Sequence, residues 1–281
     1  MLPSGRAPIA TASAGGRAGP GWMFLTSLPL WLSGILLVGL PTLVAMFGPI
    51  LIRRRVSFAR LRTNNEVAGF KFATVGVLYA VLLAFAVIVV WEKFGEAERK
   101  VAQEAGALAT LYRLTDGIEA RSRTELRAGL TRYVAATIDG DWPAMEHGAA
   151  SPASRQELDA LYRIVLSIAP GETRGETLFG EILHQLDLVT EARRDRLIMA
   201  SGSVPDILWL VLFSGAVLTT AFTFFFGAEN LLVQTIMTGM LSVLIFSGLL
   251  VIVAIDHPFA GSVHVEPKAL SALLSDFGAT P

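Results

Sequence analysis

Four long apolar segments constrain the fold of this chain more than any other feature of its sequence. They are residues 28–52, 67–91, 207–228 and 231–255, and the only charged side chain in any of them is one lysine in the second. A helix needs about 20 apolar residues to cross the hydrocarbon core of a bilayer, so each segment is long enough to span it. The sequence therefore predicts an all-α integral membrane protein with four transmembrane helices.

The charged residues concentrate between the second and third apolar segments. Residues 92–203 hold 14 Lys and Arg and 18 Asp and Glu, which together are 32 of the 47 charges in the chain. Apolar residues recur there at helical spacing, as in Leu126, Leu130, Tyr133 and Val134. We therefore expect a helical extramembrane bundle between spans two and three, and we call residues 92–203 the extramembrane block.

The ends of the chain differ in composition from the spans. Residues 1–27 are rich in Gly, Ala, Pro and Ser, which predicts a disordered N-terminal segment. We expect a first transmembrane pair over residues 28–91, a second pair over residues 204–256, and a C-terminal tail over residues 257–281.

Several classes of function are disfavoured by the composition and by missing motifs. The net charge of −1 argues against nucleic acid as a partner. The chain has no cysteine, and its four histidines, at positions 147, 184, 257 and 264, lack metal-ligand spacing. The sequence contains no phosphate-binding loop, no zinc-protease motif and no nucleophile elbow. We expect a membrane protein that is not an enzyme and that has neither a cofactor nor a metal site.

The second span carries a stripe of small residues. Gly76, Ala80 and Ala84 are four residues apart, a pattern that lets membrane helices approach one another closely. These three residues are the predicted helix-packing positions.

A second row beside this stripe is the predicted pore lining. Lys71, Val75, Tyr79 and Leu83 are also four residues apart, so a cation would precede an apolar constriction. Apolar constrictions and charged rings are features of ion channels. Two other interpretations stay open: Lys71 lies near enough to a helix end to reach the interface, and Tyr79 has the hydroxyl for a helix–helix hydrogen bond.

Three stretches of the sequence carry a resemblance to a known family. The second span reads Gly-Val at 76–77, then Leu83 and Phe85, and it leads into Trp-Glu at 91–92. The other two stretches are Phe-Phe-Gly-Ala-Glu at 225–229 and Asp-His-Pro-Phe-Ala-Gly at 256–261. Together they resemble bacterial bestrophins. The run from residue 64 to 85 is similar to a bacterial membrane-protein family described as bestrophin-like.

The resemblance implies a function and an assembly. Bestrophins are pentameric anion channels in which the second helix of every subunit surrounds the axis. By position, the neck of such a pore falls on Val75, Tyr79 and Leu83. The implied protein is a homo-oligomeric channel for small anions such as chloride, multi-pass in a bacterial inner membrane. The alternative is a non-conducting scaffold or sensor whose extramembrane block binds a partner.

Two signals disagree on the orientation in the membrane. The loop over residues 53–66 carries five arginines against one glutamate, which favours a cytoplasmic loop and an outer block. The resemblance implies the reverse, and six basic residues near the membrane ends of the block weigh against the loop: Lys93, Arg99, Lys100, Arg193, Arg194 and Arg196. We expect a cytoplasmic block.

Overall fold

The computed structural model describes residues 28–63, 65–168 and 173–279. Every regular element within these ranges is helical, and four helices are long and apolar enough to cross a membrane. They lie at Leu30–Arg55, Asn65–Gly117, Asp206–Phe225 and Leu231–Ile255. The predicted all-α class, with four spans and a helical bundle between the second and third, is confirmed. The disorder predicted for residues 1–27 falls outside the described residues.

The first span is one helix with a wider turn in it. It consists of α1 (Leu30–Gly34), the π-helical turn η2 (Ile35–Gly39) and α2 (Leu40–Arg55). Pro41 is the second residue after η2 and has no N–H to donate to the preceding turn. A π turn changes the hydrogen-bond register at that point, so the helix continues past the proline. A short helix, α3 (Phe58–Thr63), follows in the basic loop.

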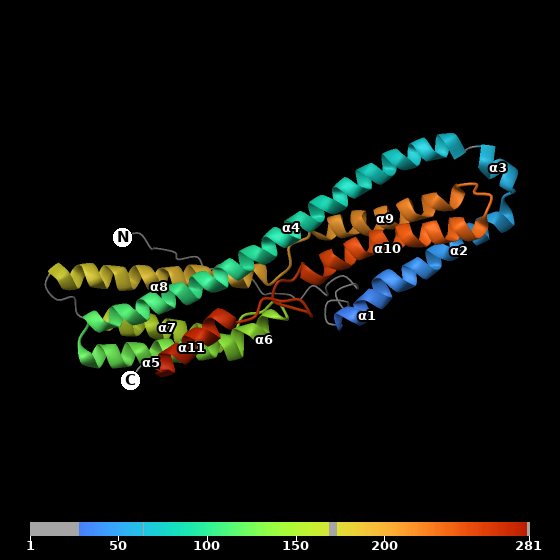
Figure 1. Ribbon diagram of the computed structural model, residues 1–281. Helices are drawn as coiled ribbons and strands as arrows, with labels where there is room; N and C mark the ends of the chain where they lie inside the picture. The colour runs from blue at the N-terminus through green and yellow to red at the C-terminus, as the bar shows by residue number, and fades with distance from the viewer. Residues whose placement is uncertain (1–27, 64, 169–172, 280–281) are drawn as a thin grey trace, which may run out of the picture.

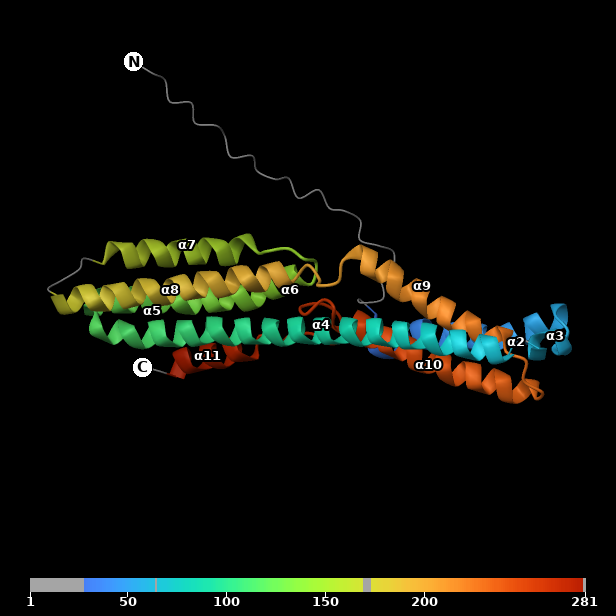
Figure 2. The ribbon, with the colours of Figure 1, turned by 90° about the horizontal axis from the view of Figure 1, so that it is seen from above.

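The second span belongs to a helix that runs through the whole molecule. Helix α4 (Asn65–Leu114) has 50 residues, none of them proline. At 1.5 Å per residue it is about 75 Å long. Figures 1 and 2 show it passing from the membrane helices at one end to the extramembrane block at the other. It is therefore a member of both regions.

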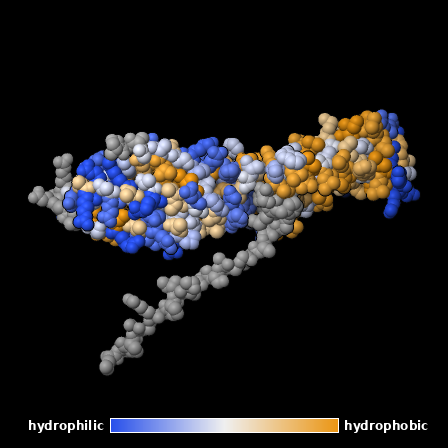
Figure 3. All heavy atoms as spheres, turned by 90° about the horizontal axis from the view of Figure 1, so that it is seen from below, coloured by the Kyte–Doolittle hydropathy of each residue, from blue (hydrophilic) through white to orange (hydrophobic). Residues whose placement is uncertain are grey.

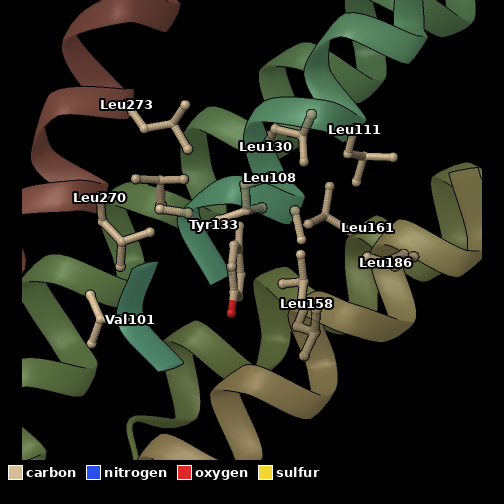
Figure 4. Packing of buried hydrophobic residues seen from close by; sticks show 14 of the residues in the cluster. Val101, Leu108, Leu111, Leu130, Tyr133, Leu158, Leu161, Leu186, Leu270 and Leu273 are labelled. Carbon is tan, nitrogen blue, oxygen red and sulfur yellow. The ribbon is translucent and has the colours of Figure 1, made fainter. Parts of the chain in front are cut away.

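The extramembrane block is a bundle around the second half of α4. The turn η3 (Thr115–Gly117) leads into α5 (Ala120–Ala136), the π turn η4 (Thr137–Asp141) and the short α6 (Trp142–Met145). Helices α7 (Pro152–Ser167) and α8 (Thr173–Met199) complete it. Figure 4 shows Tyr133 among leucines of α4, α5 and α7, including Leu108 and Leu161. Burial of these aliphatic side chains drives the bundle together.

A helix at the C-terminus joins this core. Helix α11 (Lys268–Ala279) lies in the segment expected to be a tail. Its Leu270 is fully buried, and the ring of Phe277 stacks on Tyr112 of α4 with 4.1 Å between centroids. Helix α11 is thus part of the extramembrane bundle.

The other two spans are α9 (Asp206–Phe222), which ends in the turn η5 (Thr223–Phe225), and α10 (Leu231–Ile255). Helix α10 lies between α2 and the other membrane helices. In the most apolar 18-residue stretch of each helix, 44% of the residues are buried in α10 and 11% in α4. Helix α10 is the centre of the membrane region, and α4 lies at its periphery.

Candidate pore helix and its supports

The start of α4 is fixed by one side chain and one glycine. The Asn65 amide donates to the Gly227 carbonyl at 2.8 Å, and its oxygen accepts from the Gly227 N–H at 2.7 Å. A Cβ at Gly227 would lie 2.6 Å from the backbone nitrogen of Arg62. Only glycine permits this approach. The beginning of α4 is therefore tied to the turn between α9 and α10.

Two residues of the predicted pore row face into the subunit. Tyr79 is buried, and its hydroxyl donates to the Leu212 carbonyl of α9 at 3.0 Å. Its ring occupies a notch at Gly215, where a Cβ would lie 2.5 Å from the ring carbons. Leu83 fills a similar notch on α10 at Gly248, where a Cβ would lie 2.8 Å from Cδ2. These side chains hold α4 against α9 and α10, and the helix–helix hydrogen bond is the interpretation of Tyr79 that the structure supports.

The other two residues of that row face outward. Lys71 is exposed and makes no ion pair within the described part of the chain, and Val75 is also exposed. The reason is angular: four residues turn a helix about 40° beyond a full turn, so three such steps amount to about 120°. A row at i, i+4, i+8 and i+12 winds from one side of α4 to the next. The four residues do not share one face.

The small-residue stripe is open in the single subunit. A Cβ at Gly76 would meet no atom within 4 Å, and Ala80 and Ala84 are exposed. Within residues 28–63, 65–168 and 173–279, the stripe is therefore left largely uncovered. The role of the stripe in helix packing stays a prediction, and its partner would have to come from outside the subunit.

The outer face of α4 is a continuous apolar surface that the sequence interpretation missed. Phe70, Val77, Val81, Phe85 and Ile88 are exposed by 49–78%, and they lie opposite the inward residues Phe72, Tyr79, Leu83 and Val90. We call these five residues the outer face. The sequence signal was present, because the outer face and the inward residues both follow the 3.6-residue period.

Buried charges beside α4 were also missed. In the extramembrane block, Arg196 of α8 is fully buried, and its Nε lies 2.9 Å from Oε2 of Glu104 on α4. Its Nη2 lies 3.2 Å from Oδ2 of Asp141 in η4, and Arg193 Nε lies 2.9 Å from the same oxygen. Tyr133 donates to Glu104 at 2.6 Å. We call Glu104, Asp141, Arg193 and Arg196 the charge network; it balances two acids with two arginines.

The electrostatics of the charge network are those of a closed structural site. Burial acts to lower the pKa of Arg196, but Glu104 and Asp141 outweigh it, so the pKa is raised. Burial, reinforced by Glu104, raises the pKa of Tyr133 well above its usual range. Arg196 therefore stays charged and Tyr133 stays neutral. No group of three His, Asp or Glu side chains suited to a metal ion occurs within the described ranges.

One further carboxylate joins the two regions. Asp256, at the end of α10, is buried and accepts from the N–H groups of Ser203 and Val204 at 3.0 and 2.9 Å. Gly202, with φ of +85°, makes the turn that brings these groups to it. The link from α8 to α9 is thereby fastened to the last span.

Comparison with known proteins agrees with this architecture. Two crystal structures of a bacterial bestrophin homologue from Klebsiella pneumoniae are similar to the chain in fold. One, of a mutant, has a TM-score of 0.68 at 15% identity and covers 86% of this chain and 99% of its own. The other has a TM-score of 0.66 at 15% identity and covers 86% and 98%. A search of curated proteins finds no match.

Fold and spans together define an all-helical integral membrane protein with a long shared helix and an extramembrane bundle. The family model for the Bestrophin-like domain matches residues 19–270, which is most of the chain. The protein therefore belongs to the bestrophin-like family.

Proposed function

We propose that this protein is a homo-oligomeric ion channel selective for small anions, with α4 of each subunit beside the central path. The observation that carries the proposal is the position of α4, which presents its outer face, its small-residue stripe and Lys71 outside the subunit. A path within one subunit is disfavoured, because Leu212, Ala216 and Leu249 fill the space between its membrane helices. The proposed path therefore lies between copies.

The surfaces of α4 suggest a role for each group of residues. With the stripe of Gly76, Ala80 and Ala84 packed on a neighbouring subunit, the outer face would line the path. The apolar side chains of Val77, Val81 and Phe85 would then form the constriction, because they lie on the side of α4 that faces away from the rest of the subunit.

The remaining residues of the predicted row take two different roles in this proposal. Lys71 and Val75 lie on the flank of the path, and the lysine, near the end of the span, attracts anions. Tyr79 and Leu83 position α4 from behind through α9 and α10.

Assembly and location follow the resemblance to bestrophins. We propose five copies, a bacterial inner membrane, and a cytoplasmic block. We propose a structural role for the charge network of the block. Its buried charges are paired with one another, so none of its four side chains is free for catalysis. The proposal assigns ion transport to this protein and no enzymatic reaction.

Single cysteines test which helix lines the path, because the native chain has none. Val81→Cys places a thiol on the outer face of α4. The control, Val44→Cys, places one on α2 at another exposed valine; Val81 is 49% exposed and Val44 is 64% exposed. Both proteins are reconstituted in liposomes, and chloride efflux is followed before and after a charged thiol reagent. The reagent is expected to change efflux through Val81→Cys and to leave Val44→Cys unchanged.

A second pair of variants separates the two roles on the predicted row. Lys71→Ala is expected to lower the preference for chloride over potassium, whereas Tyr79→Phe is expected to leave it unchanged. A protein that stays monomeric in detergent and in lipid would contradict the proposal. A well-folded oligomer without efflux at several pH values would favour the scaffold or sensor, and the search would move to the extramembrane block.

A further inference from the structure

A cavity of about 540 Å³ lies at the end of the membrane helices that carries the basic loop. Most of its wall is apolar, with Phe72 of α4, Phe226 and Ala228 of the turn, and Met237 and Leu241 of α10. This volume is within the range of small-molecule sites. An apolar cavity at the edge of a membrane span suits a hydrocarbon chain.

One buried polar atom in this wall has no hydrogen-bond partner in the part of the chain that the structure describes. Gln234 is 5% exposed and lines the cavity. Its amide nitrogen donates to the Phe226 carbonyl at 2.6 Å, which fixes the orientation of the group. Its carboxamide oxygen accepts no hydrogen bond from residues 28–63, 65–168 or 173–279. A buried acceptor left in this state is costly, so the cavity favours an occupant that carries a donor.

The basic loop over residues 53–66 contacts two residues of the cavity wall. Arg53 donates to the Ala228 carbonyl, and the Arg62 backbone lies against Gly227 in the same turn. Arg54, Arg55 and Arg60 are exposed elsewhere in the basic loop, and Nη1 of Arg62 lies 3.5 Å from Oε1 of Glu229. Figure 3 shows this hydrophilic tip directly beyond the apolar band of the membrane helices. Juxtamembrane clusters of arginine attract anionic headgroups.

We propose that this cavity holds an acyl chain of an anionic phospholipid whose headgroup carries a hydroxyl donor, as in phosphatidylglycerol. The acyl chain lies along Phe72, Met237 and Leu241, the phosphate lies among the exposed arginines, and the hydroxyl donates to Gln234. The lipid occupies the space between the start of α4 and α10. This inference concerns binding and holds whether or not the protein conducts ions.

Two methionines of α10 give a matched pair for the test. Met237 lines the cavity and is 65% exposed, whereas Met240 does not line it and is 69% exposed. The full-length protein is purified, stripped of lipid and titrated with phosphatidylglycerol, and bound lipid is counted by native mass spectrometry. Met237→Trp is expected to lose the tightest lipid per subunit, and Met240→Trp is expected to keep it. Equal retention by the two variants would overturn the proposal.

Two more variants test the headgroup. Removing charge with Arg54→Gln, Arg55→Gln and Arg60→Gln is expected to reduce the preference for phosphatidylglycerol over phosphatidylcholine by about fivefold per arginine. Gln234→Leu is expected to weaken the binding of phosphatidylglycerol and to leave the binding of phosphatidylcholine unchanged. A wild-type protein that binds both lipids equally would contradict the headgroup assignment.

A neighbouring subunit is the competing occupant of the cavity. In that case, Met237→Trp would lower the oligomer fraction of lipid-free protein while lipid retention stayed as in the wild type. That result would overturn the lipid site. Because the readout is bound lipid and not efflux, failure here is distinguishable from failure of the channel proposal.

Discussion

The membrane region and the extramembrane block are both built on α4, yet they are held together in different ways. The block surrounds its half of α4 with a large aliphatic core and encloses the charge network within it. The membrane region leaves most of its half of α4 uncovered. It holds this half by the hydrogen bond from the Tyr79 hydroxyl and by the packing of two side chains against Gly215 and Gly248. In water the hydrophobic effect drives burial, whereas in lipid close packing and interhelical hydrogen bonds must hold the helices together.

The charge network gives the largest expected effect. Arg196→Met removes one of the two positive charges that pair with the buried carboxylates of Glu104 and Asp141. Removing one partner of a buried ion pair lowers the free energy of unfolding by about 3–5 kcal/mol. Heat-induced loss of helical circular dichroism in detergent measures the change. Arg194→Met, at an exposed position on the same helix, is expected to unfold like the wild type. If both variants unfold at the same temperature, the block does not depend on its charge network.

The glycine notch is the corresponding weak point of the membrane region. Gly215→Ala places a methyl group 2.5 Å from the ring of Tyr79, and overpacking of this kind costs about 1–3 kcal/mol. The same thermal assay detects it. Gly106→Ala, at an exposed position of α4 outside the membrane region where a Cβ meets nothing within 4 Å, serves as the control and is expected to show no loss. Equal losses at both positions would show that space at the notch is unimportant.

The hydroxyl of Tyr79 is expected to contribute less to the stability of the membrane region than the fit of its ring at Gly215. Tyr79→Phe keeps the ring in its notch and removes only the bond to the Leu212 carbonyl. Interhelical hydrogen bonds in membranes average about 0.6 kcal/mol, so we expect a small fall in unfolding temperature. A loss as large as that of Gly215→Ala would mean that the hydroxyl, and not the fit of the ring, fastens α4.

A partly exposed ion pair in the block, between Lys100 and Asp195, also gives a small effect. The hydrogen bond to Asp195, at 2.7 Å, is the main cause that raises the pKa of Lys100. Because that pKa is higher in the folded state, the stabilisation is present below the unfolded value of 10.5 and is lost as pH rises through the folded value. Asp195→Asn is expected to cost less than about 1 kcal/mol near neutral pH. The difference from wild type should close in alkaline unfolding experiments, and a difference that persists there would need another cause.

The fold was predictable because hydropathy and helical period are local properties of the sequence. Four apolar segments and a polar block suffice to define the class and the order of elements. Helix α11 was not predicted, because its apolar residues become meaningful only against Tyr112, far away in the chain.

The candidate site was less predictable. The spacing of four residues placed Lys71 and Tyr79 on one face, although the angular drift of the row separates them. The charge network joins residues 52 to 92 positions apart, and no pattern in the sequence pairs them. Arg193 and Arg196 are chemically identical to the exposed Arg194 between them, so only the tertiary packing distinguishes their roles.

The length of α4 has a mechanical consequence. With no proline between residues 65 and 114, the helix has no point at which its two halves would bend independently. A rod of this length that tilts by about 5° around its middle moves each end by about 3 Å, in opposite directions. A movement of the extramembrane half of this lever would therefore displace the half in the membrane in the opposite direction.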